Sequence, residues 1–162
     1  MSIARKICMV GDFGVGKTSL IEQFVHKQFS DRYLTTIGVK IDTKDMSIHG
    51  QNLRLVIWDL AGKSSFSKLD HSFLKGAAGY LLVADGTRSE TIATAQSLAE
   101  EIAGQWGDLP FCFLINKSDL EDQWEANDSK TTSFAQCVFK TSAKTGEGVD
   151  DAFDALAERV AP

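Results

Sequence analysis

Residues 11–18 read GDFGVGKT, and they lie between an apolar run and a helix-like stretch. Their spacing, G-x-x-x-x-G-K-[ST], is that of a phosphate-binding loop, or P-loop. Its glycines lack Cβ atoms, so successive backbone N–H groups can approach a triphosphate closely. Lys17 would bring a positive charge to the terminal phosphates, Thr18 a hydroxyl to Mg²⁺, and the helix opening at Gly16 the positive end of its dipole. The alternative, a chance glycine turn, is disfavoured by the strand–loop–helix order.

The composition is that of an ordinary soluble globular protein, with 162 residues, 43% hydrophobic and 24% charged. This length predicts one domain over residues 1–162. The net charge of −5 argues against nucleic acid as a partner. No window approaches the roughly 20 apolar residues of a membrane span. Residue 2 is Ser and the final AERVAP has no cysteine, so we expect no lipid anchor.

Cys8, Cys112 and Cys137 lie far apart in strand-like segments, without CxxC spacing. This pattern predicts small buried side chains in a reducing compartment. A redox or metal site is the alternative interpretation. Because the N-terminal MSIARK also lacks the apolar core of a signal peptide, we expect a cytoplasmic protein that does not depend on disulfides.

Apolar segments that read as strands alternate with segments that read as helices. The strand-like runs are residues 3–10, 53–58, 79–84, 110–115 and 137–140. Residues 39–48 alternate in polarity and end at a His-Gly turn, which predicts one antiparallel hairpin. The helix-like stretches are residues 17–26, 66–75, 91–106 and 149–160. The order predicts an α/β fold, with a mostly parallel six-stranded sheet, one antiparallel edge strand and helices on both faces.

Two tetrapeptides follow predicted strands and suit a guanine base. NKSD, residues 116–119, offers the Asp119 carboxylate, which can accept parallel hydrogen bonds from guanine N1–H and its exocyclic amine. Adenine has no such pair of donors, and a mismatched buried polar group is costly. TSAK, residues 141–144, offers the Ala143 N–H to guanine O6. Either motif alone could be a surface turn. Together, after a P-loop, they predict GTP or GDP as the ligand.

The motifs GDFGVGKT, TTIG, WDLAG, NKSD and TSAK occur in the order found in small GTPases of the Ras superfamily. Over nearly its whole length the chain resembles the Rab-like branch, including its prokaryotic members. The resemblance implies a P-loop NTPase fold, Mg²⁺-dependent binding of GTP or GDP, and hydrolysis of GTP to GDP and phosphate. It also implies a monomeric switch, with effectors, GTPase-activating proteins and exchange proteins as partners at the switch regions.

The resemblance assigns residues to the nucleotide, the metal and catalysis. The nucleotide set is Gly14, Val15, Gly16, Lys17, Thr18, Ser19, Phe29, Thr36, Gly62, Asn116, Lys117, Asp119, Ser142, Ala143 and Lys144. The Mg²⁺ set is Thr18, Thr36 and Asp59, and the catalytic set is Lys17, Thr36, Gly62 and Lys63. Because Thr36 and Gly62 would touch the γ-phosphate, hydrolysis would release their loops and change the surface that partners meet.

Lys63 departs from the family pattern, since most relatives carry there a glutamine that orients the attacking water. An ammonium donates hydrogen bonds and cannot accept one. Lys63 would pair with the γ-phosphate or point into solvent, and in both cases we expect slow intrinsic hydrolysis. A guanine-nucleotide-binding scaffold that does not hydrolyse is the alternative. A P-loop ATPase or kinase is disfavoured by Asp119.

Phe13 is a second departure, because many relatives have a small residue there. Its ring would obstruct an arginine finger from an activating protein or lie flat on the surface. Apolar residues near the predicted switches form the expected partner surface: Ile37, Trp58, Phe66 and Leu69.

Overall fold

The computed structural model describes residues 2–29, 39–60, 72–126 and 133–162. Its centre is a six-stranded sheet in the order β2-β3-β1-β4-β5-β6. Neighbouring strands are parallel except for β2, which pairs antiparallel with β3 at one edge. The strands are β1 (Ile3–Gly11), β2 (Val39–Ile48), β3 (Gln51–Leu60), β4 (Gly79–Asp85), β5 (Phe111–Asn116) and β6 (Val138–Lys140). The predicted fold class is confirmed.

The β2–β3 hairpin turns at two residues with positive φ, His49 at 52° and Gly50 at 80°. Ile48 and Gln51 are the last paired residues on either side of it. A two-residue turn with both φ values positive matches the right-handed twist of the strands, and glycine adopts such values at no steric cost. The predicted hairpin is therefore confirmed.

Strand register brings the chemically important residues to one edge of the sheet. β1 pairs with β3 up to Asp59 and with β4 up to Val83, so the P-loop leaves the sheet beside both strands. Asp85, the last residue of β4, pairs with Asn116, the last residue of β5. Because carboxyl ends of parallel strands share an edge, polar side chains from β3, β4 and β5 surround the P-loop.

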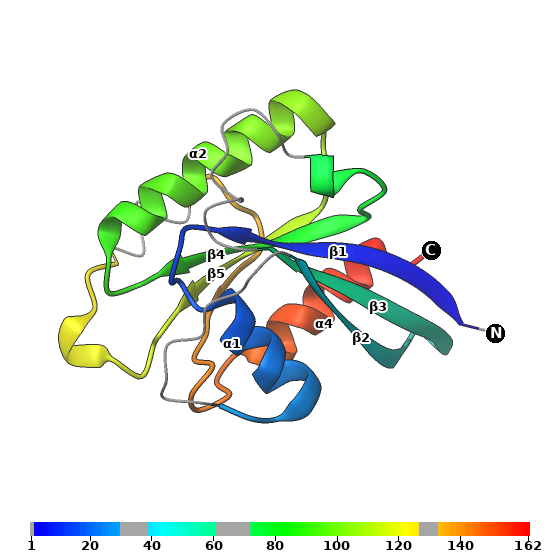
Figure 1. Cartoon of the computed structure of the whole chain (residues 1–162), viewed down its shortest axis with the longest axis horizontal. Coiled ribbons are helices and arrows are strands. Elements are labelled where there is room, and N and C mark those ends of the chain that lie inside the picture. The colour runs from blue at the N-terminus through cyan, green and yellow to red at the C-terminus, as the bar shows by residue number, and fades with distance from the viewer. Residues whose placement is uncertain (1, 30–38, 61–71, 127–132) are drawn as a thin grey trace.

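Helices cover both faces of the sheet, as Figure 1 shows. α2 (Ser89–Trp106) lies on one face, and α1 (Lys17–Ile21) and α4 (Val149–Val160) lie on the other. Short 3₁₀ helices span Ser72–Leu74 and Glu121–Gln123. The helices predicted at residues 91–106 and 149–160 are confirmed. Of the helix predicted at residues 66–75, the part before residue 72 lies outside the described residues.

The helix predicted at residues 17–26 changes character halfway. α1 continues into a π-helical turn, Glu22–His26, whose wider coil ends at Lys27 with φ 54°. In this turn the Phe24 ring stacks on Phe153 of α4 with centroids 4.0 Å apart. This contact joins the π-helical turn to α4 in the core on that face of the sheet. π-helical turns often occur at functional sites, and in this one Gln23 donates to the carbonyl of Ala143 in the predicted TSAK motif.

The prediction of three unpaired cysteines is wrong for two of them. Cys112 of β5 and Cys137, which precedes β6, form a disulfide. The Phe113 N–H donates to the Cys137 carbonyl at 2.7 Å, so the two cysteines lie side by side across adjacent strands. Strand pairing, which their separation of 25 residues does not reveal, brings them together. Cys8 is free, and burial raises the pKa of its thiol to about 12, although Lys6 opposes the shift.

No helix in the described part of the chain is both long enough and apolar enough to cross a membrane. In open α/β sheets, ligands bind in the loops beyond the carboxyl ends of the strands.

Candidate nucleotide-binding site

The P-loop joins β1 to α1, and its glycines have backbone conformations that other residues rarely adopt. Gly14 has φ 74° and Gly16 has φ 104°. A Cβ at Gly16 would overlap the side-chain amide of Asn116. Glycine is therefore required at position 16 both for the left-handed backbone and for the close approach of β5. The Leu20 N–H then donates to the Gly16 carbonyl at 2.9 Å and begins α1.

Lys17 is a buried cation at the mouth of this loop, with 6% of its surface exposed. Its Nζ donates to the Gly11 carbonyl at 2.9 Å. Burial lowers the pKa of Lys17 to about 8, although Asp59 and Asp12 act in the opposite direction. A phosphate beside Nζ would favour the charged form again. Lys17 is thus placed to bind an anion in its protonated, charged form.

Thr18 and Asp59 form a pair of oxygen ligands next to Lys17. The Thr18 hydroxyl donates to Asp59 Oδ2 at 2.6 Å, and Asp59 is fully buried at the end of β3. Mg²⁺ prefers hard oxygen ligands and is commonly bound through one or two carboxylates together with substrate phosphates. The pair fits such an ion. Thr36, the third predicted ligand, lies outside the described residues.

The two predicted base-binding motifs meet at the ends of β5 and β6. The Ser142 hydroxyl donates to Asp119 Oδ1 at 2.7 Å. The Ser118 N–H donates to the Thr141 carbonyl at 3.0 Å, which holds the two loops together along their backbones. Gln23, in the π-helical turn, donates to the carbonyl of Ala143 at 2.7 Å. The Asp119 carboxylate and the Ala143 backbone are thus held in one structural unit.

The predicted base-binding motif NKSD also contacts the P-loop directly. Asn116 Nδ2 donates to the Val15 carbonyl at 3.0 Å, and Lys117 Nζ donates to the Gly14 carbonyl at 3.1 Å. The Thr141 hydroxyl donates to Asn116 Oδ1 at 3.1 Å and fixes the orientation of that amide. The structure therefore connects the residues predicted to bind the base with those predicted to bind the phosphates.

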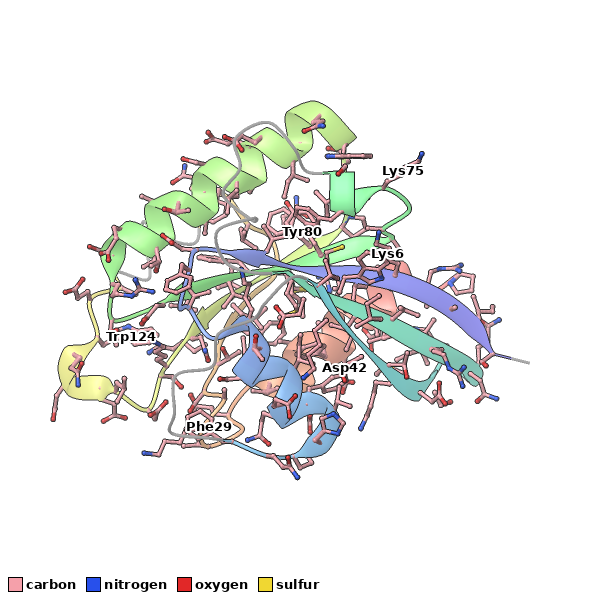
Figure 2. All side chains as sticks on the ribbon, viewed as in Figure 1. Lys6, Phe29, Asp42, Lys75, Tyr80 and Trp124 are labelled. Atoms are coloured by element: carbon pink, nitrogen blue, oxygen red, sulfur yellow. A yellow bond between two sulfur atoms is a disulfide. The ribbon has the colours of Figure 1, made fainter. Side chains whose placement is uncertain are left out.

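Some predicted residues lie at the margin of this cluster. Ser19 is in α1 next to Thr18 and is partly buried. Phe29 follows the π-helical turn and is 39% exposed; Figure 2 shows it at the end of the first helical segment. Lys144 is exposed beside the buried Ala143. These positions leave Phe29 and Lys144 accessible to a ligand.

The predicted catalytic geometry falls largely outside the described residues, which exclude Thr36, Gly62 and Lys63. The same holds for Ile37, Phe66 and Leu69 of the expected partner surface. Trp58 is described: it is half-buried in β3, and Lys6 Nζ lies 3.8 Å from the centroid of its ring. Lys6 also donates to the Lys75 carbonyl at 2.8 Å, and Figure 2 shows these two lysines on the same side of the molecule.

Sequence reasoning missed Asp85, Arg88 and Gln23. Asp85 is 1% exposed, and its Oδ2 lies 2.9 Å from Lys117 Nζ. One signal in the sequence could have identified Asp85. It is a polar residue at the end of the apolar run of β4, as Asn116 is at the end of β5. Gln23 and Arg88 have no comparable signal, because the Ala143 and Phe13 carbonyls that they bind are distant in the sequence.

The sheet order, the glycine loop after β1 and the polar residues at its carboxyl edge define a P-loop nucleotide-binding protein of the Ras type. A model of the Ras family matches residues 6–162. The chain is also 36% identical over 165 residues to Ras-related protein Rab-7a of Dictyostelium discoideum, a match covering 96% of this chain and 81% of that protein. The chain belongs to the Ras family, as a Rab-like small GTPase that binds guanine nucleotide and hydrolyses GTP.

Proposed function

We propose that this protein is a molecular switch, built as one domain over residues 1–162, in which the described loops bind GTP or GDP. The observation that carries the assignment is the Ser142–Asp119 hydrogen bond of 2.7 Å, which orients the carboxylate predicted to read guanine. A carboxylate fixed in this way accepts hydrogen bonds from guanine and leaves adenine unmatched. The backbone of Ala143 would contact guanine O6, with Phe29 and Lys144 beside the ring.

The P-loop would hold the phosphates. The N–H groups of Gly14, Val15 and Gly16 and the charge of Lys17 would face the phosphate oxygens, with Ser19 next to them. Thr18 and Asp59 would hold Mg²⁺ together with Thr36. When bound, Mg²⁺ neutralises charge on the β- and γ-phosphates. Thr36 and Gly62 would sense the γ-phosphate and convert hydrolysis into a change of surface.

Intrinsic hydrolysis is slow in this proposal, because Lys63 replaces the glutamine that orients water in most relatives. The argument is chemical: an ammonium has no lone pair with which to accept a hydrogen bond from the attacking water. Lys63 thus retains attraction for the γ-phosphate without promoting attack on it. The Phe13 ring is 43% exposed and would obstruct an activating arginine unless it lies flat on the surface when a partner binds.

Rab-like GTPases act through effectors, GTPase-activating proteins and exchange proteins. We propose that such partners bind this protein at its switch regions, and that it acts as a monomer in the cytoplasm without binding nucleic acid. The negative net charge of −5 supports the exclusion of nucleic acid.

Single-turnover hydrolysis tests the proposal. The purified protein is loaded with GTP and Mg²⁺, and phosphate release is followed for the unaltered chain and for Lys63→Gln. We expect the variant to be at least about tenfold faster, the effect of one restored hydrogen bond of about 1.4 kcal/mol in the transition state. An equal or lower rate in the variant would refute the role of Lys63. No hydrolysis in either protein would favour the non-hydrolysing scaffold.

A further inference from the structure

Three consecutive carbonyl oxygens of the P-loop, at positions 13, 14 and 15, accept hydrogen bonds from side chains of other elements. The donors, in that order, are Arg88 Nη2 at 2.8 Å, Lys117 Nζ at 3.1 Å and Asn116 Nδ2 at 3.0 Å. The second and third donors belong to the NKSD motif. Arg88 belongs to no motif that the family resemblance assigns, and it reaches the loop from the start of α2.

Holding these carbonyls fixes the N–H groups of the same peptide units. A trans peptide is planar, so its C=O and N–H point in opposite directions. The peptide that carries the Phe13 carbonyl also carries the Gly14 N–H. The N–H groups of Gly14, Val15 and Gly16 therefore point away from these three donors. In a P-loop such N–H groups face the phosphates.

Asp85 keeps Arg88 in place. Its Oδ2 lies 3.1 Å from Arg88 Nε and 2.9 Å from Lys117 Nζ, so one carboxylate serves two cations. Its Oδ1 accepts bonds from the backbone N–H and the hydroxyl of Thr87, at 2.8 and 2.6 Å. Burial alone would raise the pKa of Asp85, but the hydrogen bonds from Thr87 and Lys117 lower it overall. The carboxylate therefore stays ionised and orients the guanidinium.

The backbone that carries Arg88 is itself fixed. Trp124 packs so closely on Gly86 that a Cβ at this glycine would overlap the indole ring, and Figure 2 shows Trp124 below the start of α2. The Glu125 N–H donates to the Gly86 carbonyl at 2.7 Å, and the Glu125 carboxylate accepts from the Ser89 N–H at 3.0 Å. Arg88 thus extends from an anchored turn toward the P-loop.

We propose that Arg88 is a positioning residue for the nucleotide phosphates: by holding the Phe13 carbonyl, it directs the Gly14 N–H at them. This inference rests on the proposed function, since it takes a guanosine phosphate as the ligand. Arg88 does not touch the nucleotide. Arg88 holds the Phe13 carbonyl, just as Lys117 and Asn116 hold the next two carbonyls of the loop.

The test uses GDP as the probe and compares Arg88→Met, Arg88→Lys and a matched control, Arg54→Met. Methionine keeps the apolar stem and removes every donor. Arg54 is an exposed arginine paired with Asp45 at 2.7 Å in the β2–β3 hairpin, remote from the P-loop. The GDP dissociation rate is measured, together with amide ¹H–¹⁵N spectra of the GDP-bound proteins labelled at glycine.

We expect GDP to dissociate about tenfold faster from Arg88→Met, the effect expected of one charge-assisted hydrogen bond. Arg88→Lys should restore part of the loss, because a single ammonium replaces the planar fork that serves Asp85 and Phe13 together. The Gly14 amide resonance should shift in Arg88→Met while the Gly16 resonance, supported by Asn116, stays in place. Arg54→Met should alter neither measurement.

Two results would overturn the positioning role. One is a dissociation rate and a Gly14 resonance in Arg88→Met equal to those of the control. The other is a uniform shift of the glycine resonances, because this indicates general loosening rather than an effect on one peptide. Failure of the unaltered protein to bind GDP would instead refute the proposed function, and the positioning role with it. The two failures can be told apart because GDP binding is measured on the unaltered protein before any variant is compared with it.

Discussion

The two ends of the candidate site are held by different kinds of interaction. At the phosphate end, the side chains are charged and buried: Lys17, Asp59 and Asp85 are 6%, 0% and 1% exposed. At the base end, hydroxyl and amide groups make the contacts, as Ser142 does with Asp119 and Gln23 with the Ala143 carbonyl. A buried charge is tolerated only with its partners, whereas the single hydrogen bonds at the base end contribute modestly and chiefly direct geometry. The phosphate end should therefore be the more sensitive to charge and pH, and the base end should determine specificity.

Asp85→Asn should produce the largest change, because it removes the charge that two cations share. Lys117 and Arg88, which are 34% and 38% exposed, would both lose the buried carboxylate that they share. Because water screens the two cations in part, we expect a loss of about 2 kcal/mol in the free energy of unfolding. Urea unfolding of the GDP-bound protein measures the loss. Asp45→Asn is the matched control, since Asp45 pairs with Arg54 at the exposed surface and its removal should leave the midpoint unchanged. Equal midpoints for the two variants would contradict the sensitivity to charge that is expected of the phosphate end.

The affinity for GDP should fall as the pH rises through about 8, the pKa to which burial lowers Lys17. Below this pH the free protein already carries the proton that phosphate binding requires. Above it, binding must include proton uptake, because the phosphates raise the pKa again. A titration from about pH 7 to about pH 9 should show roughly tenfold weaker binding at the upper limit. A flat profile would indicate that Lys17 does not face the phosphates.

The fold was largely predictable because its signals are local. Continuous apolar runs indicated β1, β4 and β5, and helical periodicity indicated α2 and α4. The start of α2 lies two residues earlier than predicted, at Ser89, where its first N–H is bound by the distant Glu125 carboxylate. Such a contact between residues far apart in the sequence leaves no periodic trace.

The same limit applied to the site. The spacing of residues in the sequence predicted the P-loop, NKSD and TSAK. Close approach of the backbone and recognition of a base both require particular residues within short segments. The spacing did not bring out the bond from Arg88 to Phe13, the π-helical turn that presents Gln23, or the Cys112–Cys137 disulfide. Each depends on how distant segments pack, so only the three-dimensional structure joins them.

The central claim, that this site binds a guanine nucleotide through Asp119, is tested most directly by exchanging the carboxylate for an amide. Xanthine has a carbonyl oxygen where guanine has its exocyclic amine, so a donor at position 119 should suit xanthine and a carboxylate should suit guanine. Affinities for GDP and xanthosine diphosphate are measured for the unaltered protein and for Asp119→Asn. The account predicts that the unaltered protein prefers GDP and that the variant prefers xanthosine diphosphate. The same preference in both proteins would contradict it.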